Sequence, residues 1–192
     1  MNENEKIIKI GSNHFKEILS PEMLESKIHE LAKIIAVNYS ESDSLVLLIV
    51  TNGGMYFGVA LSMALQDLGV PHCVDTVRIK RYVGDGKTTT TGIKISSTPS
   101  LKLLNRDVIV VEDLIDEGLT MNFLDHYLKT TEEMKPKSLE YCVLVEKKDH
   151  VKLSFGIKYF ILDQAGPEWL VGFGMDSNFG YRGLRGIYAK TN

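Results

Sequence analysis

Hydrophobic residues recur at two different spacings along the chain, and each spacing predicts one kind of element. Just after residue 20, apolar side chains return every third or fourth position and therefore share one face of a helix. They are Leu24, Ile28, Leu31 and Ile35. Ser20 and Pro21 stand directly before this stripe, as a helix N-cap and a first helical residue commonly do. The pattern predicts an amphipathic helix that begins at Pro21.

Continuous apolar runs predict buried strands. Residues 45–50 are apolar at every position, and 107–111 are apolar after the first residue, which is typical of strands covered on both faces. The remaining pattern predicts helices at 55–68 and 120–129 and further strands at 72–82, 139–145 and 158–162. Because strands alternate with helices, we expect an α/β fold with a twisted, mainly parallel sheet flanked by helices.

Polar segments separate these elements. Residues 83–92 are rich in glycine and threonine and predict a loop, and the acidic residues 112–118 predict a turn. The two ends of the chain are less regular. We expect a single domain over residues 1–192, with a core at about 20–163 and a small hood formed by about 1–16 and 164–192.

The composition is that of an ordinary globular chain, with 44% hydrophobic residues among 192 and a net charge of −3. This mild acidity gives no electrostatic reason for binding nucleic acid or a membrane surface, and no apolar run is long enough to span a bilayer. Cys73 and Cys142 lie in apolar runs, and we expect both to be buried and reduced. We therefore expect a cytoplasmic protein without nucleic-acid or membrane partners.

The stretch 108–120 combines features that suit a phosphorylated sugar. A buried strand ends in Glu112 and Asp113, a third acid follows, and Gly118 and Thr120 open a helix. Ligands of open α/β sheets bind at the carboxyl ends of strands, and a helix N-terminus offers free N–H groups to a phosphate. The adjacent carboxylates can accept hydrogen bonds from vicinal ribose hydroxyls, directly or through Mg²⁺. An acidic pair alone would indicate a solvated turn, but this ordered combination favours a ribose-phosphate site.

This stretch resembles the phosphoribosyl pyrophosphate (PRPP) motif of the type I phosphoribosyltransferases. The resemblance continues at Lys147, where the hypoxanthine-guanine branch has its base-reading lysine. The segment 169–176 (WLVGFGMD) resembles the purine-stacking and metal-binding segment of that branch, and Arg182 follows where it has an arginine that binds pyrophosphate. On these motifs, which extend from about residue 45 to the C-terminus, the chain is identified as a member of the 6-oxopurine branch with its type I fold.

The resemblance implies four groups of binding residues. PRPP would be bound by Glu112, Asp113, Asp116, Glu117, Gly118, Leu119 and Thr120. Pyrophosphate would be bound by Asn52, Gly53 and Arg182, and the purine by Lys147, Trp169 and Leu170. Mg²⁺ is the implied cofactor, with Glu112, Asp113 and Asp176 as its ligands. Asp116 would be the catalytic residue, which contacts N7 of the purine and helps to deprotonate it as N9 attacks C1 of the ribose.

Several positions depart from the family pattern; Leu119, for one, replaces a lysine or similar residue, which costs little if only its backbone binds the ligand. Asn52 stands in the pyrophosphate loop where a lysine is usual, although we still expect the family's cis peptide at Thr51-Asn52. Glu117 replaces a threonine in the PRPP loop, where a carboxylate should repel a phosphate unless its side chain points away. Arg81 replaces a serine directly before the predicted loop 83–92, which is our candidate for a lid that closes the site.

The resemblance implies purine salvage: hypoxanthine or guanine and PRPP would give IMP or GMP and pyrophosphate. Lys147 only donates hydrogen bonds, so it should prefer a 6-oxo base to a 6-amino base. Family members are commonly dimers or tetramers, so we expect a homodimer or homotetramer. The alternative is a regulator on the same fold that senses PRPP or a nucleotide without catalysis. A pyrimidine- or adenine-specific enzyme is a lesser alternative.

Overall fold

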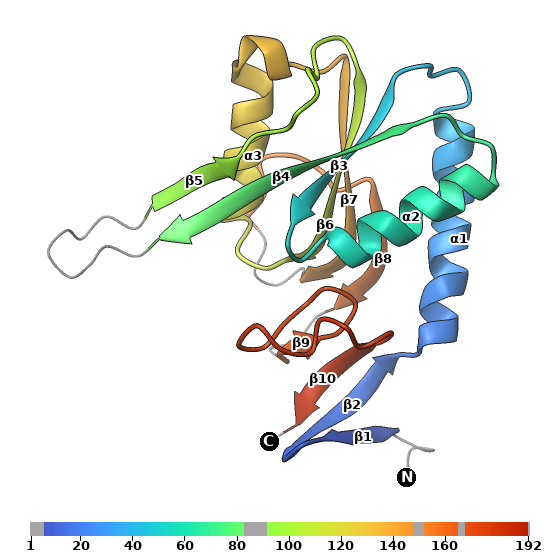
Figure 1. The fold of residues 1–192 in the computed structure, drawn as a ribbon, viewed down its shortest axis with the longest axis vertical. Helices are drawn as coiled ribbons and strands as arrows, with labels where there is room; N and C mark the ends of the chain where they lie inside the picture. The colour runs from blue at the N-terminus through green and yellow to red at the C-terminus, as the bar shows by residue number, and fades with distance from the viewer. Residues whose placement is uncertain (1–5, 83–91, 148–151, 165–167, 192) are drawn as a thin grey trace, which may run out of the picture.

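The computed structural model describes residues 6–82, 92–147, 152–164 and 168–191. Its centre is a six-stranded sheet in the order β5-β4-β3-β6-β7-β8 (Figure 1). The strands are β3 (Leu45–Thr51), β4 (Cys73–Tyr82), β5 (Gly92–Ser97), β6 (Asp107–Ile115), β7 (Ser138–Lys147) and β8 (Tyr159–Gln164). All neighbouring pairs are parallel except β4 and β5. The predicted mainly parallel sheet is therefore confirmed.

Helices cover both faces of this sheet, as predicted for an α/β fold. They are α1 (Pro21–Asn38), α2 (Met55–Asp67) and α3 (Leu119–Thr130), with a 3₁₀ turn η1 (Glu132–Met134). Helix α1 begins at Pro21, and the Ser20 hydroxyl accepts a hydrogen bond from the Met23 N–H at 3.3 Å. Helix α2 ends just before Gly69, whose φ of +72° suits glycine at a helix C-terminus.

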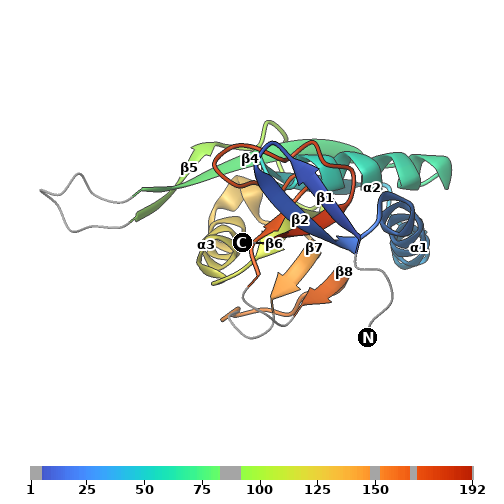
Figure 2. The same ribbon diagram turned by 90° about the horizontal axis from the view of Figure 1, so that it is seen from below.

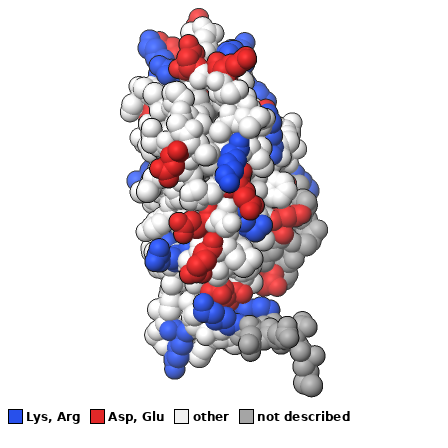
Figure 3. Space-filling model, turned by 90° about the vertical axis from the view of Figure 1, so that its right-hand side faces the viewer, with Lys and Arg blue, Asp and Glu red and all other residues white. Residues whose placement is uncertain are grey.

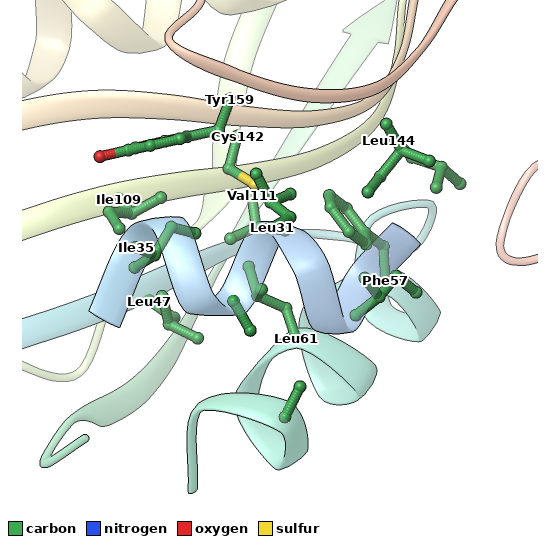
Figure 4. Packing of buried hydrophobic residues seen from close by; sticks show 14 of the residues in the cluster. Leu31, Ile35, Leu47, Phe57, Leu61, Ile109, Val111, Cys142, Leu144 and Tyr159 are labelled. Atoms are coloured by element: carbon green, nitrogen blue, oxygen red, sulfur yellow. The ribbon is translucent and has the colours of Figure 1, made fainter. Parts of the chain in front are cut away.

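Alternate residues of the central strands face opposite sides, which divides the core into two clusters. Leu47, Ile109 and Cys142 pack with α1 and α2, as the close view in Figure 4 shows. The intervening residues, such as Leu48 and Val110, pack with α3 instead. Strands β3 and β6 are thus buried on both faces, which explains why their sequences are continuously apolar.

Three local expectations are corrected by the structure. Residues 112–115, predicted as part of a turn, continue β6 because they pair with β7. Strand β5 was not predicted and begins at Gly92, the last residue of the predicted loop; the rest of that loop lies outside the described residues. Cys73 is exposed, unlike the buried Cys142, because it begins β4, which has β3 on one side at that point and pairs with β5 only from Arg78 onward.

The two ends of the chain form a second sheet in the order β1-β2-β10-β9. Its strands are β1 (Ile7–Ile10), β2 (Asn13–Leu19), β9 (Leu170–Val171) and β10 (Ile187–Thr191), and neighbouring pairs are antiparallel. Figures 1 and 2 place this sheet beyond the carboxyl ends of β6, β7 and β8. This is the expected hood, which takes in residues up to 19 at its N-terminal side. It therefore faces the edge of the central sheet where a ligand is expected.

On the face that carries α1, acidic and basic side chains are interspersed among the residues that the structure describes (Figure 3). Within those residues, no helix is long and apolar enough to cross a membrane.

Candidate active site

The turn from β6 into α3 forms a pocket of about 180 Å³, lined by residues 112–121 and by Arg81. Gly118 is the N-cap of α3 and has a φ of +73°, which glycine adopts without strain. A Cβ at this position would also lie 3.0 Å from Leu153 Cδ2. The N–H groups at the start of α3 border the pocket, and such groups suit a phosphate.

Glu112 and Asp113 place two carboxylates next to this pocket. Glu112 is 8% exposed, and its Oε1 accepts a hydrogen bond from the Asp113 N–H at 3.0 Å. Asp113 Oδ1 accepts one from the Leu114 N–H at 2.8 Å. Burial, followed by the charge of Asp113, raises the pKa of Glu112 well above its ordinary value, and burial also raises the pKa of Asp113. Arg182 opposes both shifts without cancelling them, so a bound cation, or hydrogen bonds donated by ribose hydroxyls, would favour the ionised carboxylates.

The loop that follows β3 lies against these carboxylates. A Cβ built on Gly53 would lie 2.2 Å from Asp113 Oδ2, so only glycine fits here without movement of that side chain. A Cβ on Gly174 would lie 2.0 Å from the Gly53 carbonyl oxygen. The Thr51-Asn52 peptide is cis, as expected, and Asn52 is exposed. The loop after β3, the end of β6 and the C-terminal loop therefore meet at one point.

Arg182 and Asp176 contact each other across the C-terminal loop. The Arg182 guanidinium lies 2.5 Å from Asp176 Oδ1 and also donates to the Gly174 carbonyl. Asp176 Oδ2 accepts a hydrogen bond from the Phe179 N–H at 2.8 Å. The sequence assigned these two residues to separate ligands, pyrophosphate and metal. In the structure, these two side chains form an ion pair with each other.

Lys147, Trp169 and Leu170 occupy very different environments. Lys147 ends β7 and is 7% exposed, yet its ammonium has no hydrogen-bond or ion-pair partner among the described residues. Trp169 is 61% exposed, and its indole N–H donates to the Asp176 carbonyl at 3.0 Å, which fixes the ring while leaving much of it open. Leu170 is buried in the core, so only its backbone is available to a ligand.

The loop residues after β6 line the pocket, and one further residue joins them. Asp116 and Glu117 are exposed, and Leu119 and Thr120 begin α3. Glu117 Oε2 lies 2.7 Å from a guanidinium nitrogen of Arg81. Sequence reasoning noted Arg81 only as a departure from the family and did not assign it to the site. The sequence did hold a signal that could have linked Arg81 to the site, because its partner Glu117 also departs from the family pattern.

The carboxylates suit Mg²⁺, although they do not form one closed site. Among the described residues, no group of three or more His, Cys, Asp or Glu side chains gathers as a metal centre. Mg²⁺ is usually bound by one or two carboxylates together with oxygens of the substrate and water. Glu112 with Asp113, and separately Asp176, match this type of incomplete ligand set.

Comparison with known proteins agrees with this geometry. The family model of the phosphoribosyl transferase domain matches residues 14–178. The hypoxanthine phosphoribosyltransferase of Salmonella typhimurium is 32% identical over 174 residues, which cover 89% of this chain and 93% of that protein. A hypoxanthine-guanine phosphoribosyltransferase structure from Bacillus anthracis is 28% identical with a TM-score of 0.76, covering 91% and 96% of the two chains. A structure of a mutant hypoxanthine phosphoribosyltransferase from Trypanosoma cruzi, complexed with the product IMP, is 25% identical with a TM-score of 0.83, covering 96% and 94% of the two chains. The chain therefore belongs to the phosphoribosyl transferase domain family and, within it, to the hypoxanthine-guanine phosphoribosyltransferases.

Proposed function

We propose that this protein transfers the 5-phosphoribosyl group of PRPP to N9 of hypoxanthine or guanine, giving IMP or GMP and pyrophosphate in purine salvage. The observation that carries the choice of base is Lys147, a buried lysine whose ammonium lacks a partner among the described residues. The C6 keto oxygen of a 6-oxopurine accepts hydrogen bonds and complements this donor. The 6-amino group of adenine would place donor against donor, so adenine is excluded.

Each part of PRPP has a complementary group in the site. The 5-phosphate binds at the turn 116–120, where the N-terminus of α3 supplies N–H donors. Glu112 and Asp113 receive the ribose hydroxyls. The pyrophosphate binds to Asn52 and Gly53 in the loop after β3, and to Arg182, whose planar guanidinium donates parallel hydrogen bonds to a diphosphate.

Asp116 is the proton acceptor in this proposal. Its carboxylate is exposed on the pocket, with no side-chain partner among the described residues. As N9 forms its bond to C1 of the ribose, the C1–O bond breaks and its electron pair leaves with pyrophosphate. The proton on N7 passes to Asp116. Trp169 and the backbone at Leu170 hold the purine in the plane that this attack requires.

Mg²⁺ fits the same arrangement as the cofactor of the reaction. Glu112 and Asp113 would hold one ion at the ribose, and Asp176 would hold a second at the pyrophosphate. Bound Mg²⁺ supplies positive charge that offsets the charge developing on the leaving pyrophosphate. Burial raises the pKa of both adjacent carboxyls, and a bound cation would favour their ionised forms.

We further propose that the chain folds as one domain and assembles with itself. Residues of the hood, among them Leu170 and Ile187, share a hydrophobic cluster with α1 and α2, which supports one domain. Helix α2 exposes Met55, Val59 and Met63 at helical spacing, and such an apolar stripe suits a homodimer or homotetramer interface. The exposed free thiol of Cys73 suits the reducing cytoplasm.

A spectrophotometric assay with PRPP, Mg²⁺ and one base at a time tests the proposal. We expect turnover of hypoxanthine, guanine or both, and none of adenine. If no base turns over while PRPP still binds, the protein is a sensor of PRPP and the transferase assignment is wrong. If adenine turns over, the role given to Lys147 is wrong.

A further inference from the structure

Two departures from the family pattern contact each other across the mouth of the phosphate pocket. Arg81 lies near the end of β4, and Glu117 lies in the turn between β6 and α3, 36 positions later. A guanidinium nitrogen of Arg81 donates to Glu117 Oε2 at 2.7 Å, and the two side chains are 46% and 62% exposed. Exposed ion pairs of this kind add little to folding stability. The position of this pair therefore matters more than its contribution to the fold.

The pocket poses an electrostatic problem that Arg81 can solve. Glu117 lines it, and its carboxylate would repel an incoming phosphate. Arg81 lines the same pocket and, among the described residues, is the one cationic side chain that does so. A guanidinium has five N–H donors in a planar fork, so Arg81 can remain paired with Glu117 and still donate a hydrogen bond to a phosphate oxygen.

We infer that Arg81 binds the 5-phosphate of the substrate, and that Glu117 is a positioning residue that holds the guanidinium at the pocket. This inference rests on the proposed function, because it takes the pocket at 112–121 to be the phosphate site. It explains why a carboxylate is tolerated in the loop: its charge is compensated by the residue that recognises the ligand. Phosphate binding at this turn thus uses a charged side chain from the neighbouring strand in addition to the backbone of α3.

The test compares binding of IMP and inosine, which differ only by the 5-phosphate, by titration calorimetry on the full chain. We expect Arg81→Ala to weaken IMP binding about ten- to a hundredfold, as for a lost hydrogen bond to a charged group, with inosine binding unchanged. Arg81→Lys keeps the charge without the fork and should lie between wild type and alanine. Glu117→Gln should weaken IMP less than Arg81→Ala does and also spare inosine.

The double variant Arg81→Ala/Glu117→Ala decides whether Arg81 contacts the phosphate. If it does, the double variant still binds IMP weakly. If Arg81 only neutralises Glu117, the double variant regains wild-type affinity and the inference is wrong. The control is Lys102→Ala, which breaks another exposed pair, Lys102–Glu133 at 2.7 Å, and should leave both ligands unaffected.

Failure of this inference is distinguishable from failure of the proposed function. Binding is measured without turnover, so a wild-type protein that binds IMP but transfers no ribose phosphate would refute only the catalytic proposal. An Arg81→Ala variant with unchanged IMP affinity, in a protein that turns over hypoxanthine, would refute only the role of Arg81. A wild-type protein that binds IMP no better than inosine would refute the phosphate pocket itself and the inference with it.

Discussion

Replacing Lys147 with methionine should separate the contribution of this residue to binding from its effect on the fold. Lys147 is 7% exposed, and no described residue forms an ion pair or hydrogen bond with its ammonium. Removing an ion from water costs several kcal/mol even after a protein relaxes, and the remaining exposure of Lys147 recovers part of that penalty. Methionine is unbranched like lysine and one atom shorter, and it carries no charge. We therefore expect Lys147→Met to raise the free energy of unfolding of the ligand-free protein by about 1–3 kcal/mol.

The size of the effect can be read in two assays. For a domain of this length, 1 kcal/mol shifts the melting temperature by about 2–4 °C, so the variant should melt about 2–12 °C higher without ligands. A lost hydrogen bond to a charged group is worth about 1.5–3 kcal/mol, so the KM for hypoxanthine should rise about ten- to 150-fold. The KM for PRPP should change little, because Lys147 does not line the phosphate pocket.

The matched control is Lys33→Met on the exposed face of α1. The same substitution there should change the free energy of unfolding by no more than about 0.5 kcal/mol and leave both KM values unaltered. If Lys147→Met instead lowers the melting temperature and leaves base binding intact, Lys147 is a structural residue. In that case its burial has no connection with the 6-oxopurine.

Other substitutions test the rest of the site and one structural carboxylate. Gly53→Ala would bring its Cβ to 2.2 Å from Asp113 Oδ2 and displace that carboxylate; we expect a loss of about 1–3 kcal/mol in unfolding free energy and a higher KM for PRPP, and an unchanged KM would contradict the close packing. Asp116→Asn should lower kcat about 10²–10⁴-fold with little change in KM, and an unaltered kcat in steady-state assays would remove it as the proton acceptor. Burial tends to raise the pKa of Asp107, but hydrogen bonds from Ser138 and a second serine, with a nearby lysine, outweigh burial and lower it. Because the folded pKa is the lower one, this carboxylate stabilises the fold above the ordinary aspartate pKa of 3.8 and loses that effect as the pH falls through the folded value. The stability difference between wild type and Asp107→Asn, measured by denaturant unfolding from pH 2 to pH 6, should therefore shrink toward acid.

The central fold could be predicted because the burial of each central strand is visible in the sequence of that strand alone. Strands β3 and β6 are covered on both faces, so every position is apolar and the run is visible without knowledge of its neighbours. The end of β6 was predicted as a turn because acids are rare in strands. Pairing of 112–115 with β7 overrides that preference, and such pairing depends on residues about 30 positions away in sequence.

The site could be predicted by residue type but not by contact. Glu112, Asp113 and Gly118 follow one another in a short motif, so a local pattern finds them. The ion pairs of Arg81 with Glu117 and of Arg182 with Asp176 depend on how β4 and the C-terminal loop reach the end of the sheet. No spacing in the sequence reports that geometry. Arg81 and Glu117 were both noted as departures from the family pattern, but nothing in the sequence paired them.

Three side chains of the candidate site present groups that a single ligand can complement. Lys147 is a buried donor without an acceptor, Asp116 is an acceptor without a donor among the described residues, and Trp169 presents a largely open ring. Each arrangement is neutral or unfavourable for an unliganded protein. A 6-oxopurine offers a keto acceptor, an N–H donor and an aromatic face on a single rigid ring. Adenine offers the last two but turns a donor toward Lys147, so the lysine stays unsatisfied. The site can therefore reject adenine without any steric clash. Adenine binds more weakly because it leaves the buried Lys147 without a hydrogen-bond acceptor.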